Sequence, residues 1–204
     1  MRPALERNEQ DREEYWTLIA THFHPEQLIF ADESHFNRLT LRRSYVWSLR
    51  GERAHRSEFS FHGAKYSILP ALSLDGIVHL EVVKNAITGD DFHRFVQGLL
   101  PLMNKWPLPN SVLVVDNASI HKVEGIHEML EEHGARLLYL PSYSPDLNPI
   151  ELAFSSIKAW LHAHRDRINI ELDSEDGNIY DAFWEAVFSV TAESAKGWYK
   201  HCGY

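Results

Sequence analysis

Two acidic residues follow apolar runs in a way that points to chemistry. Asp32 follows the run Leu28–Ala31, and Asp116 follows the run Ser111–Val115. Both runs are typical of buried strands, where carboxylates are disfavoured because an unpaired buried charge is costly. If the two strands are neighbours, their acids meet beyond the strand ends, where open α/β sheets bind ligands. Carboxylates held close together repel each other, so this arrangement indicates a cation site.

Each acid also has a purely structural interpretation, as does a third, Glu151. Asp32 could cap the end of its strand, and Asp116 could begin an ordinary Asx turn. Glu151 lies three residues after Asn148, a natural helix cap, and Pro149 suits the first helical position. This spacing predicts a capping box, which local pattern alone favours for Glu151.

Strands and helices that would position these acids alternate along the chain. Apolar runs predict strands at 28–31, 66–74, 77–83, 111–115 and 136–140, and a short further strand at 45–47. The Asp-Gly pair at 75–76 predicts a hairpin between two of them. Helical spacing predicts helices at about 92–103 (with a kink or boundary at Pro101), 123–133, 150–161, 179–190 and 192–201. The order predicts an α/β fold with a mixed sheet and helices on its faces.

The composition is that of an ordinary globular protein. The 204 residues are 44% hydrophobic and 24% charged, enough to bury a core without disulfides. The single cysteine, Cys202, excludes an internal disulfide. Residues 1–10 contain no apolar signal region, and no apolar run reaches membrane-spanning length, so we expect neither secretion nor a membrane span. The chain has no second cysteine and no His-Glu-x-x-His pattern, so we do not expect a zinc site.

The net charge of −9 is unevenly distributed. Taken whole, it argues against a nucleic-acid partner. Residues 35–65 nevertheless hold seven Lys or Arg against two acids, and residues 166–185 hold seven acids against Arg167 alone. The basic stretch could contact phosphate, although two solvated surface patches are the interpretation that charge alone favours.

Three segments around the acids carry motifs. They are FADESHF at 30–36, VVDNASIH at 114–121 and SPDLNPIE at 144–151, with 34 residues between Asp116 and Glu151. In this order and spacing they resemble the catalytic domain of DDE-type transposases of the mariner superfamily. Residues 46–52 resemble a further element of that family, and the chain end at 197–204 resembles that of fungal members. The resemblance covers roughly residues 25–204.

The resemblance implies a ribonuclease H-like fold, with a mixed five-stranded sheet flanked by helices. It implies that Asp32, Asp116 and Glu151 are catalytic and bind two divalent ions, normally Mg²⁺, for which Mn²⁺ can substitute. The implied reaction is metal-dependent cleavage of DNA at transposon ends, followed by strand transfer. The implied partners are transposon-end and target DNA, with a homodimer assembled on the DNA and no membrane. The location would be nuclear in a eukaryote.

Further residues are candidate DNA contacts. His121 follows the second motif acid closely and could touch DNA or metal-bound water. Lys158 lies seven residues after Glu151, on the same helix face, although a plain solvated lysine is the favoured interpretation. The basic stretch supplies the other candidates, Arg42, Arg43, Arg50 and Arg53.

The resemblance also implies a division of the chain. We expect residues 1–27 to be an N-terminal arm or linker remnant, 28–166 the ribonuclease H-like DDE core and 167–204 a C-terminal helical segment. Family members carry an N-terminal helix-turn-helix region, so we expect a catalytic fragment, a truncated copy or a repurposed descendant. Two other functions stay open: a catalytically silent DNA-binding or interaction protein, and a ribonuclease H-like nuclease without strand transfer.

Overall fold

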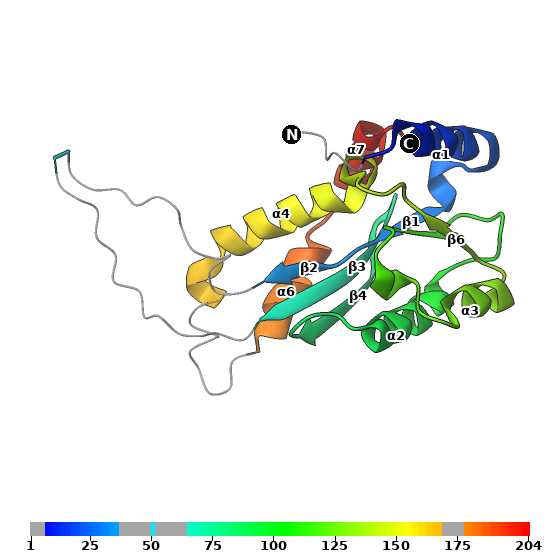
Figure 1. Cartoon of the computed structure of the whole chain (residues 1–204). Coiled ribbons are helices and arrows are strands. Elements are labelled where there is room, and N and C mark those ends of the chain that lie inside the picture. Colours follow the sequence, from blue (N-terminus) through cyan, green and yellow to red (C-terminus); the bar gives the residue numbers. More distant parts are fainter. Residues whose placement is uncertain (1–6, 37–49, 52–64, 169–177) are drawn as a thin grey trace.

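The computed structural model describes residues 7–36, 50–51, 65–168 and 178–204. A mixed sheet lies between two layers of helices (Figure 1). β1 is central, antiparallel to β3 on one side and parallel to β5 on the other, and β6 continues the parallel half. The strands are β1 (Leu28–Ala31), β2 (Ser34–Phe36), β3 (Tyr66–Ser73), β4 (Gly76–Lys84), β5 (Val112–Val115) and β6 (Arg136–Tyr139). The predicted α/β fold with a mixed sheet is confirmed.

The sheet has six strands rather than the five predicted, because the first strand is interrupted. Ala31 pairs with Ala71 and Ser34 pairs with Ile68, so β2 continues the register of β1 along β3. Asp32 therefore falls opposite Pro70, which has no N–H to donate to a ladder. The break leaves Asp32 in the middle of what would otherwise be one long strand, with its carboxylate free for other contacts.

Successive side chains along each strand point to opposite faces of the sheet, and this divides the core into two halves. Leu28 and Phe30 of β1 face one helical layer, and Ile29 and Ala31 face the other. The first layer contains α1 (Glu9–His22), α4 (Pro149–Ala163), α6 (Ile179–Phe188) and α7 (Ala192–Cys202), and the second contains α2 (Gly89–Leu99) and α3 (Ile126–His133).

The predicted hairpin and helices are present. Gly76 has a φ of 106°, which an Asp-Gly turn allows, and β3 and β4 pair along their whole length. α2 ends at Leu99, and Pro101 lies in the single 3-10 turn Leu100–Leu102 that follows it. The helix boundary predicted at Pro101 is therefore present. Gly134, with a φ of 87°, ends α3.

The segments expected at either end of the core pack against it. Tyr15 and Ile19 of α1 are buried in the first half of the core, together with Phe183 of α6 and Tyr199 of α7. The Tyr199 hydroxyl lies 2.9 and 3.0 Å from the carbonyl oxygens of Leu28 and Leu72, and its single proton is shared between these two acceptors. Within the described residues, none of the helices is both long and apolar enough to cross a membrane.

Candidate metal and catalytic site

The sheet brings the two strand-end acids together. β1 and β5 are parallel neighbours, with Phe30 paired to Val114, so Asp32 and Asp116 leave the sheet at the same edge. The loop after β6 leads into α4, whose first turn carries Glu151. All three acids line one cleft of about 380 Å³. The structure thus places the three sequence-predicted site residues around a single space.

Asp32 is held by two hydrogen bonds and lies among other acids. The Glu33 backbone N–H donates to its Oδ1 at 2.8 Å, and the Asn148 side-chain amide donates to its Oδ2 at 2.9 Å. Burial is the main reason that the pKa of Asp32 is raised to about 8. The carboxylates of Glu33, Asp116 and Glu151 add to this shift. Burial and the neighbouring carboxylates both disfavour the ionised form of this carboxyl in the absence of a bound cation.

Asp116 is paired with a buried histidine. His121 Nδ1 lies 2.7 Å from Asp116 Oδ1, and His121 Nε2 lies 3.3 Å from Glu33 Oε2, without the alignment of a hydrogen bond. Burial alone would lower the pKa of His121, but the two carboxylates outweigh it and raise the pKa to about 9. Burial would likewise raise the pKa values of Glu33 and Asp116, and the imidazolium lowers both.

Glu151 lies on the exposed side of α4 near the cleft. Partial burial raises the pKa of its carboxyl, Lys158 opposes that shift, and the carboxylates of Asp116 and Glu33 add to it. The capping-box prediction for Glu151 is wrong. Asn148 makes no side-chain cap bond in α4, because its amide is turned toward Asp32.

The acids of the cleft fit a hard divalent cation. Burial is the main cause of the raised pKa values of Asp32 and Glu151, and the neighbouring carboxylates add to both shifts. Oxygen ligands of this kind are those that Mg²⁺ and Mn²⁺ prefer. Among the residues that the structure describes, no three His, Cys, Asp or Glu side chains are already arranged to hold an ion.

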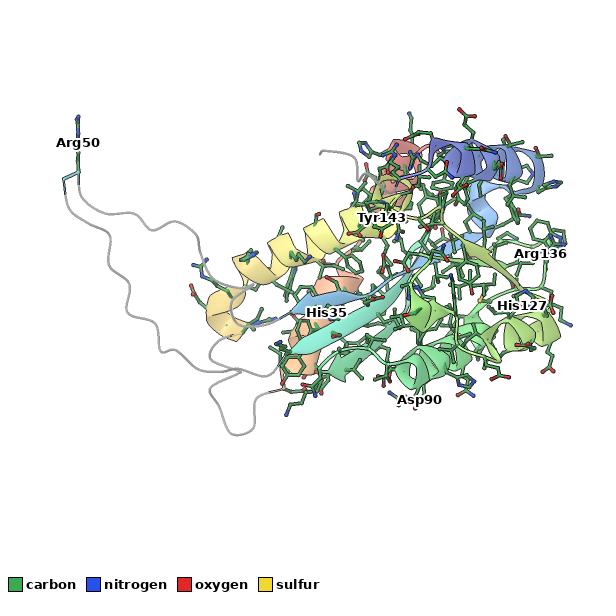
Figure 2. The ribbon with its side chains drawn as sticks, viewed as in Figure 1. His35, Arg50, Asp90, His127, Arg136 and Tyr143 are labelled. Carbon is green, nitrogen blue, oxygen red and sulfur yellow. The ribbon has the colours of Figure 1, made fainter. Side chains whose placement is uncertain are left out.

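The candidate DNA contacts have different positions. His121 is fully buried, with its ring 4.6 Å from that of Phe92, so its contacts here are the two carboxylates and not the surface. Lys158 is exposed on α4, with Nζ 5.9 Å from the centre of the Phe36 ring. Arg50 is exposed (Figure 2). Arg42, Arg43 and Arg53, and the strand expected at 45–47, lie outside the described residues.

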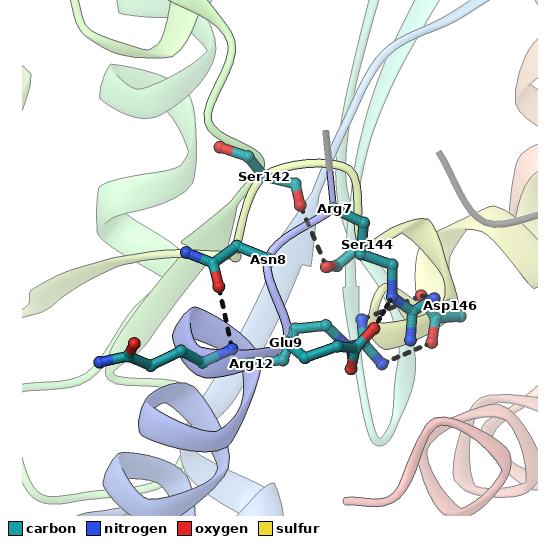
Figure 3. A network of polar contacts seen from close by, with 8 residues as sticks. Arg7, Asn8, Glu9, Arg12, Ser142, Ser144 and Asp146 are labelled. Atoms are coloured by element: carbon teal, nitrogen blue, oxygen red, sulfur yellow. Dashed lines mark hydrogen bonds and ion pairs between the residues drawn. The ribbon is translucent and has the colours of Figure 1, made fainter. Parts of the chain in front are cut away.

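α1 fixes the loop that precedes Glu151. Both terminal nitrogens of Arg12 donate to the carboxylate of Asp146, at 3.1 and 2.8 Å, and Arg7 lies 3.5 Å from the same carboxylate (Figure 3). From the other end of the chain, the Tyr204 hydroxyl donates to the Leu147 carbonyl oxygen at 2.8 Å. Segments at both ends of the described chain therefore hold the third motif in place.

The sequence did not reveal several of these site residues. Glu33 was part of the first motif, but nothing in its spacing indicated a contact with His121. Asn148 gave a capping signal that hid its bond to Asp32. The Arg12 contact joins residues 134 positions apart, which no local pattern can show.

Comparisons with known proteins bear on the family and the fold of the chain. The family model described as DDE superfamily endonuclease matches residues 27–171. No curated protein sequence matches the chain. The chain is similar in structure to the Mos1 mariner paired-end complex with Mn (TM-score 0.66, 16% identity, 98% of this chain and 61% of that one). It is also similar to the mariner Mos1 paired-end complex with Mg, with a TM-score of 0.59 and 15% identity. That match covers 100% of this chain and 65% of the Mos1 chain.

A third similar structure is the simian T-cell lymphotropic virus intasome in complex with PP2A regulatory subunit B56 gamma, with a TM-score of 0.52 and 11% identity. That match covers 93% of this chain and 51% of the other chain. At these identities the likeness shows the fold, which confirms the ribonuclease H-like prediction. The chain spans a little over three fifths of the Mos1 chains that it matches.

Proposed function

Because the chain belongs to the DDE superfamily endonuclease family, we propose that it is the catalytic domain of a mariner-type DNA transposase. Asp32, Asp116 and Glu151 are its catalytic residues and hold two divalent ions, normally Mg²⁺. The observation that carries the proposal is that these acids, from three separate segments, line one cleft at one edge of the sheet. The structural likeness to Mos1 complexes supports the mariner assignment.

Each neighbouring group has a task in this proposal. Asn148 orients Asp32, while His121 and the Ala118 backbone N–H, 2.9 Å from Asp116 Oδ1, orient Asp116. Ions bound by these carboxylates would activate the attacking water or DNA 3′ hydroxyl and stabilise the leaving oxygen. We also propose that Lys158, whose charge lowers the pKa of Glu151, contacts a phosphate of the bound strand.

The substrates are transposon-end and target DNA, and the domain works as a homodimer assembled on the DNA. The similar structures support the DNA partner, since they include a Mos1 transposase paired-end complex with the left transposon end and a Mos1 strand transfer complex. We further propose that residues 28–166 form the catalytic core, and that the protein acts in the nucleus if its source is eukaryotic.

Nicking of supercoiled plasmid tests the metal-dependent reaction. With Mn²⁺ or Mg²⁺, the wild-type chain should nick the plasmid, and Asp116→Asn should not. Asp90→Asn is the matched control, because Asp90 is an exposed acid on α2, away from the cleft (Figure 2). Nicking by Asp116→Asn at the wild-type rate would contradict the proposed site.

Pre-cut DNA ends separate the remaining functions. A transposase should join the 3′ hydroxyl of such an end to a target plasmid, whereas a nuclease without strand transfer should only hydrolyse it. A chain that binds DNA but neither nicks nor joins it, with all three acids intact, would support the catalytically silent alternative.

A further inference from the structure

Tyr143 lies at the mouth of the cleft that holds the acids. It belongs to the loop between β6 and α4 and lines the same cleft as Asp116 and Glu151. Its side chain is 58% exposed, the largest exposure of any large hydrophobic residue in the described parts of the chain (Figure 2). An aromatic ring is thus presented to solvent directly beside the reacting groups.

The backbone at Tyr143 is held in an unfavourable conformation. Its φ is 55°, in the left-handed region, where a bulky residue is an outlier. Such strain persists only where the surroundings enforce it, and it concentrates at functional sites. The surroundings here include Pro141 and Pro145, which restrict the backbone on either side.

Hydrogen bonds fix the rest of the loop. The Asn117 amide, next to Asp116, donates to the Ser142 hydroxyl at 3.0 Å. The Ser144 hydroxyl donates to the Ser142 carbonyl oxygen at 3.2 Å (Figure 3). With the Arg12 ion pair to Asp146 a few residues further on, the loop is anchored on both sides of Tyr143.

The ring itself has no partner within the described residues. It stacks on no other ring, and its hydroxyl makes no hydrogen bond there. Other exposed aromatic side chains do have ring partners. Trp184, for example, stacks on Phe188 of α6, with ring centroids 5.0 Å apart. A rigidly placed, unpartnered ring loses little conformational entropy when a flat group stacks on it.

We propose that Tyr143 is a stacking platform for an unpaired nucleobase next to the scissile phosphate. A phosphate that reaches Asp116 and Glu151 brings its flanking bases to the mouth of the cleft, where the ring lies. Every base has a π-face, so such stacking tolerates sequence, but the base must be out of the duplex stack. This inference rests on the proposed function, because it requires DNA in the cleft.

Binding of DNA with a short single-stranded flank tests the proposal. The duplex carries 2-aminopurine at each flanking position in turn, whose fluorescence falls when the base stacks, and Ca²⁺ replaces Mg²⁺ to limit cleavage. Tyr143→Asn removes the ring with a residue that tolerates the left-handed region, and Tyr143→Phe keeps the ring. Trp184→Ala is the control, an exposed aromatic outside the cleft.

We expect Tyr143→Asn to weaken binding roughly 5- to 150-fold and to abolish the fluorescence change, because one base–aromatic stack contributes that much. Tyr143→Phe and Trp184→Ala should match the wild type. An abasic flank should remove the difference between the wild type and Tyr143→Asn, which a role in loop structure alone would not do.

Two negative results are distinguishable. If the wild type nicks plasmid with Mn²⁺ but Tyr143→Asn binds the flanked duplex as tightly, the stacking proposal is overturned and the proposed function stands. If the wild type neither nicks plasmid nor binds the duplex, the proposed function fails, and the stacking proposal fails with it.

Discussion

Asp32 is an acid and His121 a base, yet the titration of each makes the metal-free protein less stable as pH rises. The pKa of Asp32 is raised from 3.8 to about 8 by burial and by neighbouring carboxylates, so the folded state keeps a proton that the unfolded state loses. The free energy of unfolding therefore falls between about pH 4 and pH 8. The pKa of His121 is raised from 6.5 to about 9 against its burial, so the stability that its charge contributes is lost between about pH 6.5 and pH 9.

The effect of metal should therefore depend on pH. A divalent ion displaces the Asp32 proton more easily at pH 8 than at pH 6, so millimolar Mg²⁺ should raise the melting temperature more at pH 8. The rise should be roughly 3 to 6 °C at ten times the dissociation constant. Asp32→Asn should stabilise the metal-free protein at pH 8 and abolish the response. A response equal at both pH values, measured by differential scanning fluorimetry, would contradict this electrostatic account.

His121 should be the most sensitive of the described histidines. Its ring packs on Phe92 and separates Asp116 from Glu33, so His121→Ala leaves both a cavity and two carboxylates without their cation. We expect a loss of about 2 to 4 kcal/mol in the free energy of unfolding, measured in urea. Mg²⁺ should recover part of it. His127→Ala is the control, because the His127 side chain is exposed on α3. It should lower the free energy of unfolding by less than about 0.5 kcal/mol.

At the residue scale, the sequence identified the acids and not their partners. Asp32 and Asp116 could be predicted because an acid after a buried apolar run is unusual. Asn148 is the N-cap residue of α4, as predicted, but its side chain does not make the predicted cap bond because its amide contacts Asp32. His121 was quoted with its motif, but whether its ring points to DNA or into the core depends on Phe92 and Glu33, which are distant in sequence.

At the scale of elements, α1 couples to the loop that carries the third motif. Arg12→Ala removes a two-bond ion pair whose arginine side chain is only 10% exposed, while Asp146 is 45% exposed and can be rehydrated. We expect a loss of about 1 to 2 kcal/mol in the free energy of unfolding. Amide hydrogens of residues 142–148 should also exchange faster with deuterium, because the loop loses an anchor.

Arg94→Ala provides a control for this prediction. Arg94 pairs with Asp91 on the exposed face of α2 and should contribute less than about 0.5 kcal/mol. If Arg12→Ala changes neither stability nor exchange more than Arg94→Ala does, α1 does not hold the loop.

Strand periodicity predicted β1, β3, β4, β5 and β6, and it missed the short strand β2 that follows Asp32. The sequence around Asp32 looks like a strand followed by polar residues, and Pro70 interrupts the ladder from the opposite strand. The hairpin at Gly76 was predictable because its turn is a local property. Packing of α1 on the core was not, since Tyr15 meets Tyr204 at the other end of the chain.

Across the whole molecule, Tyr199 ties the C-terminal helix to the centre of the sheet. Its buried hydroxyl bonds two carbonyl oxygens, so Tyr199→Phe leaves Leu28 and Leu72 each without that partner. We expect a loss of about 1 to 3 kcal/mol in the free energy of unfolding. Circular dichroism and tryptophan fluorescence should report the same single transition, because α7 and β1 share one core. Earlier unfolding of α7 alone would show that residues 167–204 are a separable segment.

The central claim is that Asp32, Asp116 and Glu151 together hold divalent ions beside DNA. Diffraction from crystals grown with Mn²⁺ and a short duplex tests it most directly, because Mn²⁺ scatters anomalously and can be located without assumption. We predict two Mn²⁺ peaks in the cleft, with oxygen atoms of all three acids at about 2.1 Å from them, and their loss in Asp116→Asn crystals. Mn²⁺ bound only outside the cleft, or unchanged in Asp116→Asn, would contradict the account.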